Sequence, residues 1–188
     1  KKASKLDIKM ICPLHGPVWR SNLGYFIDKH DKWSKYEPEE KAVMIVYASM
    51  YGNTESAATA LATKFVEKGI TNIVMYDVSN THVSTLIAET FRVSHIVLAS
   101  VTYNLGIYPL MHNYLVDMKA LNLQNRTFAL IENGSWATQS GKLMAGCINE
   151  MKNMNILEDK LSLVSSMKED NAVDMDGLVD GIIESMNK

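Results

Sequence analysis

Residues 48–55, A-S-M-Y-G-N-T-E, join the apolar run V-M-I-V-Y (43–47) to a segment whose apolar residues recur at helical spacing. A turn with a glycine and several hydroxyl groups between a strand and a helix is typical of an anion-binding loop. The N-terminus of the helix leaves backbone N–H groups free and carries roughly half a positive charge, which favours a bound anion. Because the loop contains no lysine, it predicts an anion held by dipoles and hydroxyl groups alone.

Two common nucleotide-binding motifs are absent from this loop. It lacks both G-x-x-x-x-G-K-[ST], which binds nucleoside triphosphates, and G-x-G-x-x-G, which binds dinucleotides. We therefore expect a site for one small phosphate monoester, built from Ser49, Met50, Tyr51, Gly52, Asn53 and Thr54. A helix simply capped by Asn53 or Thr54 is the alternative interpretation. Glu55 would repel a phosphate, so we expect it to face solvent.

Short apolar runs alternate with amphipathic segments from Lys41 onward. The runs predict strands at 43–49, 72–76, 95–100, 127–132 and 161–165. Most are apolar at nearly every position, as in a parallel sheet covered on both faces, and the last alternates as an edge strand does. Helical spacing predicts helices at 53–68, 83–91, 109–121, 140–154 and 173–186. This alternation predicts a doubly wound α/β sheet.

Ligands of such sheets bind beyond the carboxyl ends of the strands, which makes two more loops candidates. The first is S-V-T-Y-N-L-G-I-Y-P (100–109), from which we expect contacts by Val101, Thr102, Tyr103, Asn104 and Gly106. An aromatic face and an amide suit a flat heteroaromatic ring. We also expect Gly106 to adopt a peptide orientation closed to other residues. A simple turn is the alternative.

The second is E-N-G-S-W-A (132–137), in which Trp136 stands among turn-forming residues. We expect Trp136 to stack on the ring, with burial under the last helix as the alternative. The backbone N–H groups of Asn133, Gly134 and Ser135 are expected to bond to carbonyl groups of the ring. Glu132 is the nearest carboxylate by sequence and is expected to influence the ring's redox potential.

Composition excludes several classes of protein. The chain has 188 residues, 47% of them hydrophobic, and a net charge of −2, which argues against a nucleic-acid partner. No apolar run approaches the roughly 20 residues that span a bilayer, and no signal peptide is recognisable. Cys12 and Cys147 are too few for a disulfide framework, so we expect a cytoplasmic protein with no membrane partner.

Residues 1–40 differ from the remainder and end in the charged linker Y-E-P-E-E (36–40). The division predicts an appendage at 1–40 and a single domain at 41–188. Because the chain does not begin with Met, we expect a fragment of a longer protein. Cys147 and the methionines are expected to fill the core.

The strand–S-M-Y-G-N-T–helix unit resembles the phosphate loop of flavodoxins, which bind FMN. Together with S-V-T-Y-N-L-G-I-Y-P and E-N-G-S-W-A, it is similar to the C-terminal domain of flavodiiron proteins, the A-type flavoproteins, over about 41–188. This resemblance implies a three-layer flavodoxin-like sheet with strand order 2-1-3-4-5 and FMN as the cofactor. The sequence departs from the family's P-T-Y-N-N-G, because Val101 replaces the proline and Leu105 the second asparagine.

The segment I-C-P-L-H-G-P-V-W-R (11–20) resembles the end of the family's metallo-β-lactamase-like domain. There, the histidine of an H-G-P segment is the last ligand of a diiron centre. The resemblance implies that residues 1–40 are a remnant of that domain and that His15 binds iron only in the full-length protein. The other ligands of the family's centre are missing here.

In the intact family, as the resemblance implies, FMN receives electrons from rubredoxin or a similar donor. The diiron centre then reduces O₂ or NO, and the proteins form homodimers. This fragment is expected to bind and cycle FMN with no catalytic residue of its own. The alternatives are an NAD(P)H:quinone oxidoreductase, a stand-alone flavodoxin, and a receiver or interaction module. A receiver needs acidic residues after its first strand, where A-S-M-Y offers none.

Overall fold

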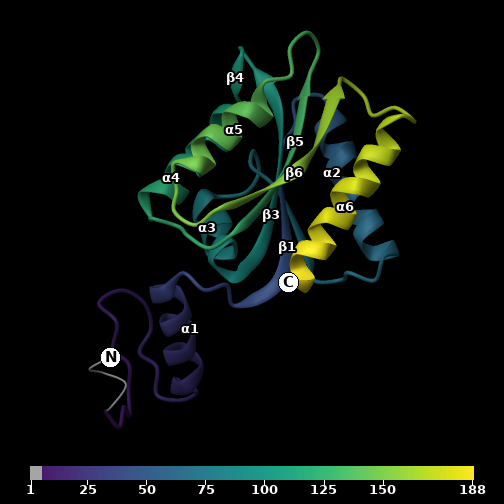
Figure 1. The fold of residues 1–188 in the computed structure, drawn as a ribbon. Coiled ribbons are helices and arrows are strands. Elements are labelled where there is room, and N and C mark those ends of the chain that lie inside the picture. Colours follow the sequence, from purple (N-terminus) through teal and green to yellow (C-terminus); the bar gives the residue numbers. More distant parts are fainter. Residues whose placement is uncertain (1–5) are drawn as a thin grey trace.

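A parallel β-sheet forms the centre of the molecule (Figure 1). The computed structural model describes residues 6–188. Its parallel strands are β1 (Glu40–Ala48), β2 (Ile73–Asp77), β3 (Val93–Tyr103), β5 (Thr127–Gly134) and β6 (Asn155–Val164). They lie in the order β2-β1-β3-β5-β6, and the two-residue strand β4 (Gly106–Ile107) pairs antiparallel with β3. Apart from β4, this is the expected order.

Helices cover both faces of the sheet, giving three layers (Figure 1). They are α2 (Asn53–Glu67), α3 (Val83–Arg92), α4 (Pro109–Ala120), α5 (Ser140–Asn149) and α6 (Asn171–Asn187). Strand β1 shows why its sequence is continuously apolar. Met44 and Val46 point into the core under α3, α4 and α5, whereas Val43 and Ile45 point into the core under α2 and α6.

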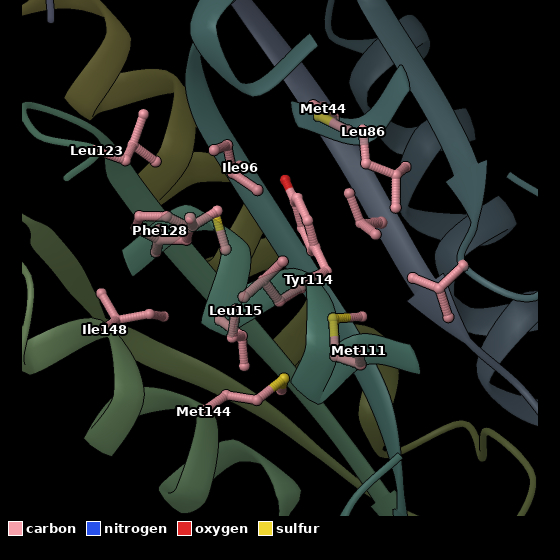
Figure 2. Close-up of a cluster of buried hydrophobic side chains, with 14 of the residues drawn as sticks. Met44, Leu86, Ile96, Met111, Tyr114, Leu115, Leu123, Phe128, Met144 and Ile148 are labelled. Atoms are coloured by element: carbon pink, nitrogen blue, oxygen red, sulfur yellow. The ribbon is translucent and has the colours of Figure 1, made fainter. Parts of the chain in front are cut away.

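The core under α3, α4 and α5 contains Tyr114 and several methionines (Figure 2). Tyr114 is fully buried, its hydroxyl group pairs with that of Thr90, and burial raises the pKa of the phenol. Met44, Met111 and Met144 are also fully buried, which confirms for them the expectation that methionines fill the core, whereas Met10, Met50, Met75 and Met167 are exposed.

Most predicted elements are present, with differences at their ends. The last parallel strand begins at Asn155 rather than at 161, and it lies at the edge as expected. Only Ile156 and Leu157 among its first six residues are apolar, which is too short a run to predict a strand. Helix α5 ends at Asn149 rather than at 154, because the chain turns there and Asn153 has a positive φ of 53°. Strand β3 continues to Tyr103, three residues beyond the predicted end.

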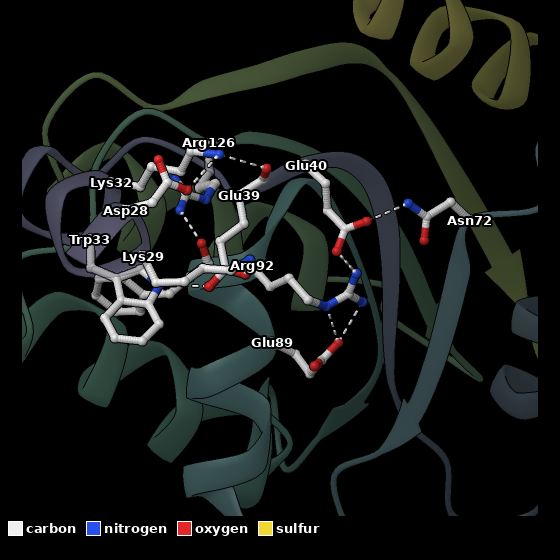
Figure 3. Close-up of polar contacts among 11 residues, drawn as sticks. Asp28, Lys29, Lys32, Trp33, Glu39, Glu40, Asn72, Glu89, Arg92 and Arg126 are labelled. Carbon is white, nitrogen blue, oxygen red and sulfur yellow. Dashed lines mark hydrogen bonds and ion pairs between the residues drawn. The ribbon is translucent and has the colours of Figure 1, made fainter. Parts of the chain in front are cut away.

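Sequence reasoning missed helix α1 (Leu23–Lys35), which contains no buried residue. It lies at the end of the molecule opposite β4 (Figure 1). The linker that follows α1 contacts the domain at the amino edge of the sheet (Figure 3). There, Arg92 Nη1 donates to the Glu40 carboxylate at 2.8 Å, and Arg126 Nη1 donates to the Tyr36 carbonyl at 2.7 Å.

Among residues 6–188, no helix has the length and apolar character needed to cross a bilayer.

Candidate functional site

The three loops singled out in the sequence meet at one cavity of about 150 Å³. It is lined by Ser49, Met50, Tyr51, Asn53, Thr54, Val101, Thr102, Asn133, Gly134, Ser135 and Ser165. The sheet register explains why they converge. Ala48 pairs with Ser100, and Val101 pairs with Asn133, so the neighbouring strands β1, β3 and β5 end side by side.

The first loop leaves the N-terminus of α2 without a side-chain cap. Gly52 is the N-cap residue, with φ 84°, and no side chain caps the backbone N–H groups of the first turn. Its own N–H donates to Ser49 Oγ at 3.1 Å, and the Ser56 N–H donates to the Gly52 carbonyl at 2.8 Å. The alternative of a helix capped by Asn53 or Thr54 is therefore wrong. The free N–H groups of the first turn suit an anion.

Charge around this cavity agrees with an anion held by dipoles. None of the residues that line it is Lys, Arg or His. Glu55 is exposed, and it accepts a hydrogen bond from the Tyr47 hydroxyl at 3.3 Å. Glu55 does not line the cavity and its side chain is exposed, as expected.

The second loop is a β-hairpin between β3 and β4. Tyr103 pairs with Gly106, and the two residues between them, Asn104 and Leu105, have φ values of 47° and 58°. Two consecutive positive φ values are typical of a type I′ turn. The expectation that Gly106 takes the special conformation is wrong, because it falls on Asn104 and Leu105 instead. Both side chains are exposed.

A second hollow of about 370 Å³ adjoins the first and shares Ser49 and Met50 with it. Its other lining residues are Tyr103, Tyr108, Pro109 and Leu110. The rings of Tyr103 and Tyr108 lie edge to face, with centroids 6.1 Å apart, and they border a space suited to a flat ring. Sequence reasoning selected Tyr103 and missed Tyr108, although Tyr108 belongs to the quoted loop.

A larger cavity of about 750 Å³ lies between the β2–α3 loop and α4. It shares only Leu110 with the hollow beside Tyr103.

The second and third loops both accept hydrogen bonds from the N-terminus of α5. Thr102 Oγ1 accepts from the N–H groups of Gln139 and Ser140 at 3.0 and 3.2 Å. The buried Glu132 carboxylate accepts from the Gly141 N–H at 3.0 Å and from Lys160 Nζ at 2.5 Å. The Glu132 side chain therefore packs against α5 with its charge paired.

Trp136 is fully exposed and lines neither of the two hollows. The alternative that it is buried under the last helix is wrong. The turn that carries it is tight, because a Cβ at Gly134 would lie 2.7 Å from the Ala137 carbonyl oxygen.

Ser165 is a site residue that sequence reasoning missed. It follows β6 with φ 69°, and its hydroxyl group accepts from Asn53 Nδ2 at 3.5 Å. The rule that parallel strands end at one edge would have found it, because β6 pairs with β5 up to Val164.

His15 lies far from this cavity in the chain segment before α1, and its side chain is exposed. Within residues 6–188 there is no group of three or more His, Cys, Asp or Glu side chains suited to hold a metal ion. The described residues therefore offer His15 no partner ligands.

Comparisons with known proteins agree with this geometry. The family described as Flavodoxin matches residues 45–159. An uncharacterized protein of Methanocaldococcus jannaschii is 33% identical over 121 residues, covering 64% of this chain and 30% of the relative. The rubredoxin-oxygen oxidoreductase of Megalodesulfovibrio gigas is 29% identical over 145 residues, covering 76% and 36%. The chain thus spans about a third of the length of these two curated relatives.

Among solved structures, the flavodiiron protein from Giardia intestinalis superposes with a TM-score of 0.82 at 23% identity. The superposition covers 99% of this chain and 47% of that protein. At this identity, the likeness shows a shared fold.

Proposed function

The chain belongs to the flavodoxin family, and we propose that it is the FMN-binding electron-transfer domain of a flavodiiron-type oxygen or nitric oxide reductase. Its flavodoxin-like part is homologous to that of the rubredoxin-oxygen oxidoreductase. The family implies FMN as the cofactor, in agreement with the expectation from the loop sequences.

One observation carries the proposal: three loops surround a cavity that contains the uncapped N-terminus of α2 and no cationic side chain. The residues present fit FMN. Ser49, Thr54 and the first-turn N–H groups would hold the phosphate, since each can donate a hydrogen bond. Tyr103 and Tyr108, beside the adjoining hollow, would border the ring. FMN, when bound, supplies reversible electron transfer.

The cofactor can be identified from the purified protein. We expect visible absorption bands of a bound flavin, and we expect heat to release FMN and not FAD. A chain purified without flavin should take up added FMN and regain the bands. Release of FAD, or refusal of FMN after reconstitution, would contradict the proposal.

The electron donor is a further part of the proposal. We propose rubredoxin or a similar small carrier, because the relative with 29% identity is a rubredoxin-oxygen oxidoreductase. Reduced rubredoxin mixed with the FMN-loaded chain should bleach the flavin bands rapidly, whereas NADPH alone should not. Rapid reduction by NADPH would favour a quinone reductase instead.

We further propose that the chain is part of a longer, cytoplasmic, homodimeric protein in which residues 1–40 belong to a metal-binding domain and His15 is an iron ligand. The segment I-C-P-L-H-G-P-V-W-R supports this proposal, as does the third of the relatives' length that the chain spans. In the longer protein, His15→Ala should lower the iron content, and His112→Ala, an exposed histidine on α4, should not. Equal iron content in both variants would contradict this assignment.

A further inference from the structure

The side chain of Asn133 connects three elements at the edge of the cavity. It belongs to β5 and is 3% exposed. Its Oδ1 accepts from the Ser165 N–H at 3.0 Å, and its Nδ2 donates to the Ser165 carbonyl at 2.9 Å and to Thr54 Oγ1 at 3.3 Å. One amide thus ties the end of β6 and the first turn of α2 to β5.

The backbone of Ser165 fixes the orientation of this amide. A backbone N–H can only donate and a carbonyl can only accept, so Oδ1 must face the N–H and Nδ2 must face the carbonyl. The second hydrogen of Nδ2 is then the one directed at Thr54. In this contact the oxygen of Thr54 is necessarily the acceptor.

Thr54 consequently keeps its hydroxyl hydrogen for another partner. No hydrogen bond among residues 6–188 uses the Thr54 hydroxyl as the donor, and the side chain is 2% exposed. Thr54 also lines the cavity at the uncapped first turn of α2. A buried hydroxyl that accepts from an amide is therefore placed to donate toward an anion at that helix terminus.

We propose that Asn133 is a positioning residue of the phosphate subsite, which holds the Thr54 hydroxyl as a donor to the phosphate monoester of the bound flavin. The inference rests on the proposed FMN function and deepens it. It assigns the Asn133 side chain to the phosphate end of the cofactor, whereas the sequence suggested only a backbone contact with the ring. An amide achieves this orientation without adding a charge beside the anion.

The test is the ratio of FMN affinity to riboflavin affinity, because riboflavin lacks only the phosphate. The affinities are measured by quenching of flavin fluorescence for the whole 188-residue chain. Thr54→Val and Asn133→Ala should each lower the ratio by about tenfold, since each removes or misdirects a hydrogen bond to a charged group. The matched control is Asn149→Ala, an exposed asparagine at the end of α5, which should leave the ratio unchanged.

A double variant tests whether Asn133 acts through Thr54. In the Thr54→Val background, Asn133→Ala should lower the ratio no more than about twofold further, because the hydroxyl that it orients is gone. Asn133→Asp should lower the ratio more than Asn133→Ala does, because a carboxylate accepts the Thr54 hydrogen and repels the phosphate. Partial unfolding cannot imitate these results, since both flavins bind the same folded fraction.

Three outcomes would overturn the inference. Asn133→Ala could weaken FMN and riboflavin equally, which would place its effect at the ring or in the fold. The two single losses could multiply in the double variant, which would make the residues independent. The wild-type chain could also bind neither flavin, which would contradict the proposed function as well. This result differs from an unchanged affinity ratio in a chain that binds FMN, which would contradict the inference alone.

Discussion

Leu105 adopts a left-handed backbone conformation that leucine rarely takes, with φ 58° and a side chain that is 71% exposed. It occupies the second position of the β3–β4 turn, where glycine is the preferred residue. Leu105→Gly should raise the free energy of unfolding by about 1 kcal/mol, because it removes the clash of Cβ in this conformation. Urea unfolding measures the change. The control is Leu14→Gly, an exposed leucine whose φ is not positive, and a gain of the same size there would contradict the explanation.

His95 makes stability depend on pH. Burial, together with the nearby charge of Lys41, lowers the pKa of its imidazole from 6.5 to about 4. Between these values the unfolded chain binds a proton at this residue and the folded chain does not, so stability falls as the pH falls from about 6.5 to 4. The full loss approaches about 3 kcal/mol.

The measurement is urea unfolding between pH 7.5 and 5, chosen to span most of this window. We expect the wild type to lose more stability than His95→Gln, which cannot take up the proton. Ser94 and Ser185 hydrogen-bond to the imidazole at 2.8 and 3.2 Å, so the variant starts from a lower stability and only the two slopes are compared. Parallel slopes would contradict the assignment.

Among the elements, α5 depends on groups from outside the helix for its N-terminal hydrogen bonds. Glu132 and Thr102, on neighbouring strands, accept from its first N–H groups. Glu132→Ala should lower the free energy of unfolding by about 2 kcal/mol, since it leaves the Gly141 N–H and the Ser162 hydroxyl without this acceptor. Glu158→Ala, an exposed glutamate on β6, is the matched control. Equal losses measured by urea unfolding would show that the cap contributes nothing.

The elements were predictable where the signal is local. Periodicity predicted the five parallel strands and five of the helices, because a sheet covered on both faces needs continuous apolar runs. Helix α1 was not predicted, because it buries no residue and so has no apolar stripe. The start of β6 was not predicted, because most residues of that part of the edge strand are exposed.

The site was predictable as a set of loops, and less so as a set of contacts. Parallel strands end at one edge, which predicted that the loops after β1, β3 and β5 meet. The contacts of Asn133 with Ser165 and of Thr102 with the start of α5 join residues more than thirty positions apart. No local pattern encodes such pairs. The turn at Leu105 is local, but leucine rarely adopts a positive φ, so its residue type did not predict this conformation.

At the scale of the whole molecule, Arg126 holds the linker before β1 against the domain (Figure 3). It is buried, and its guanidinium donates to the carbonyl groups of Tyr36, Thr90 and Phe91. Desolvation lowers its pKa to about 10, which still leaves it charged at neutral pH. Lysine carries the same charge but lacks the planar fork that reaches several carbonyls.

Arg126→Lys should therefore release the linker and α1 from the domain. Limited proteolysis should then cleave near residues 36–40 about tenfold faster than in the wild type, a rate that corresponds to roughly 1.4 kcal/mol of lost local stability. FMN affinity should not change, because the cavity lies at the opposite edge of the sheet. Unchanged proteolysis, or a parallel loss of FMN, would contradict this role.

We propose that the free N–H groups and hydroxyls at the start of α2 bind the phosphate of FMN without help from a cation. The deciding experiment is titration of the flavin-free chain with FMN, followed by flavin fluorescence. We predict saturable quenching by FMN, with riboflavin bound at least about tenfold more weakly because it lacks the charged group. Equal affinity for the two flavins, or no quenching by either, would contradict the account.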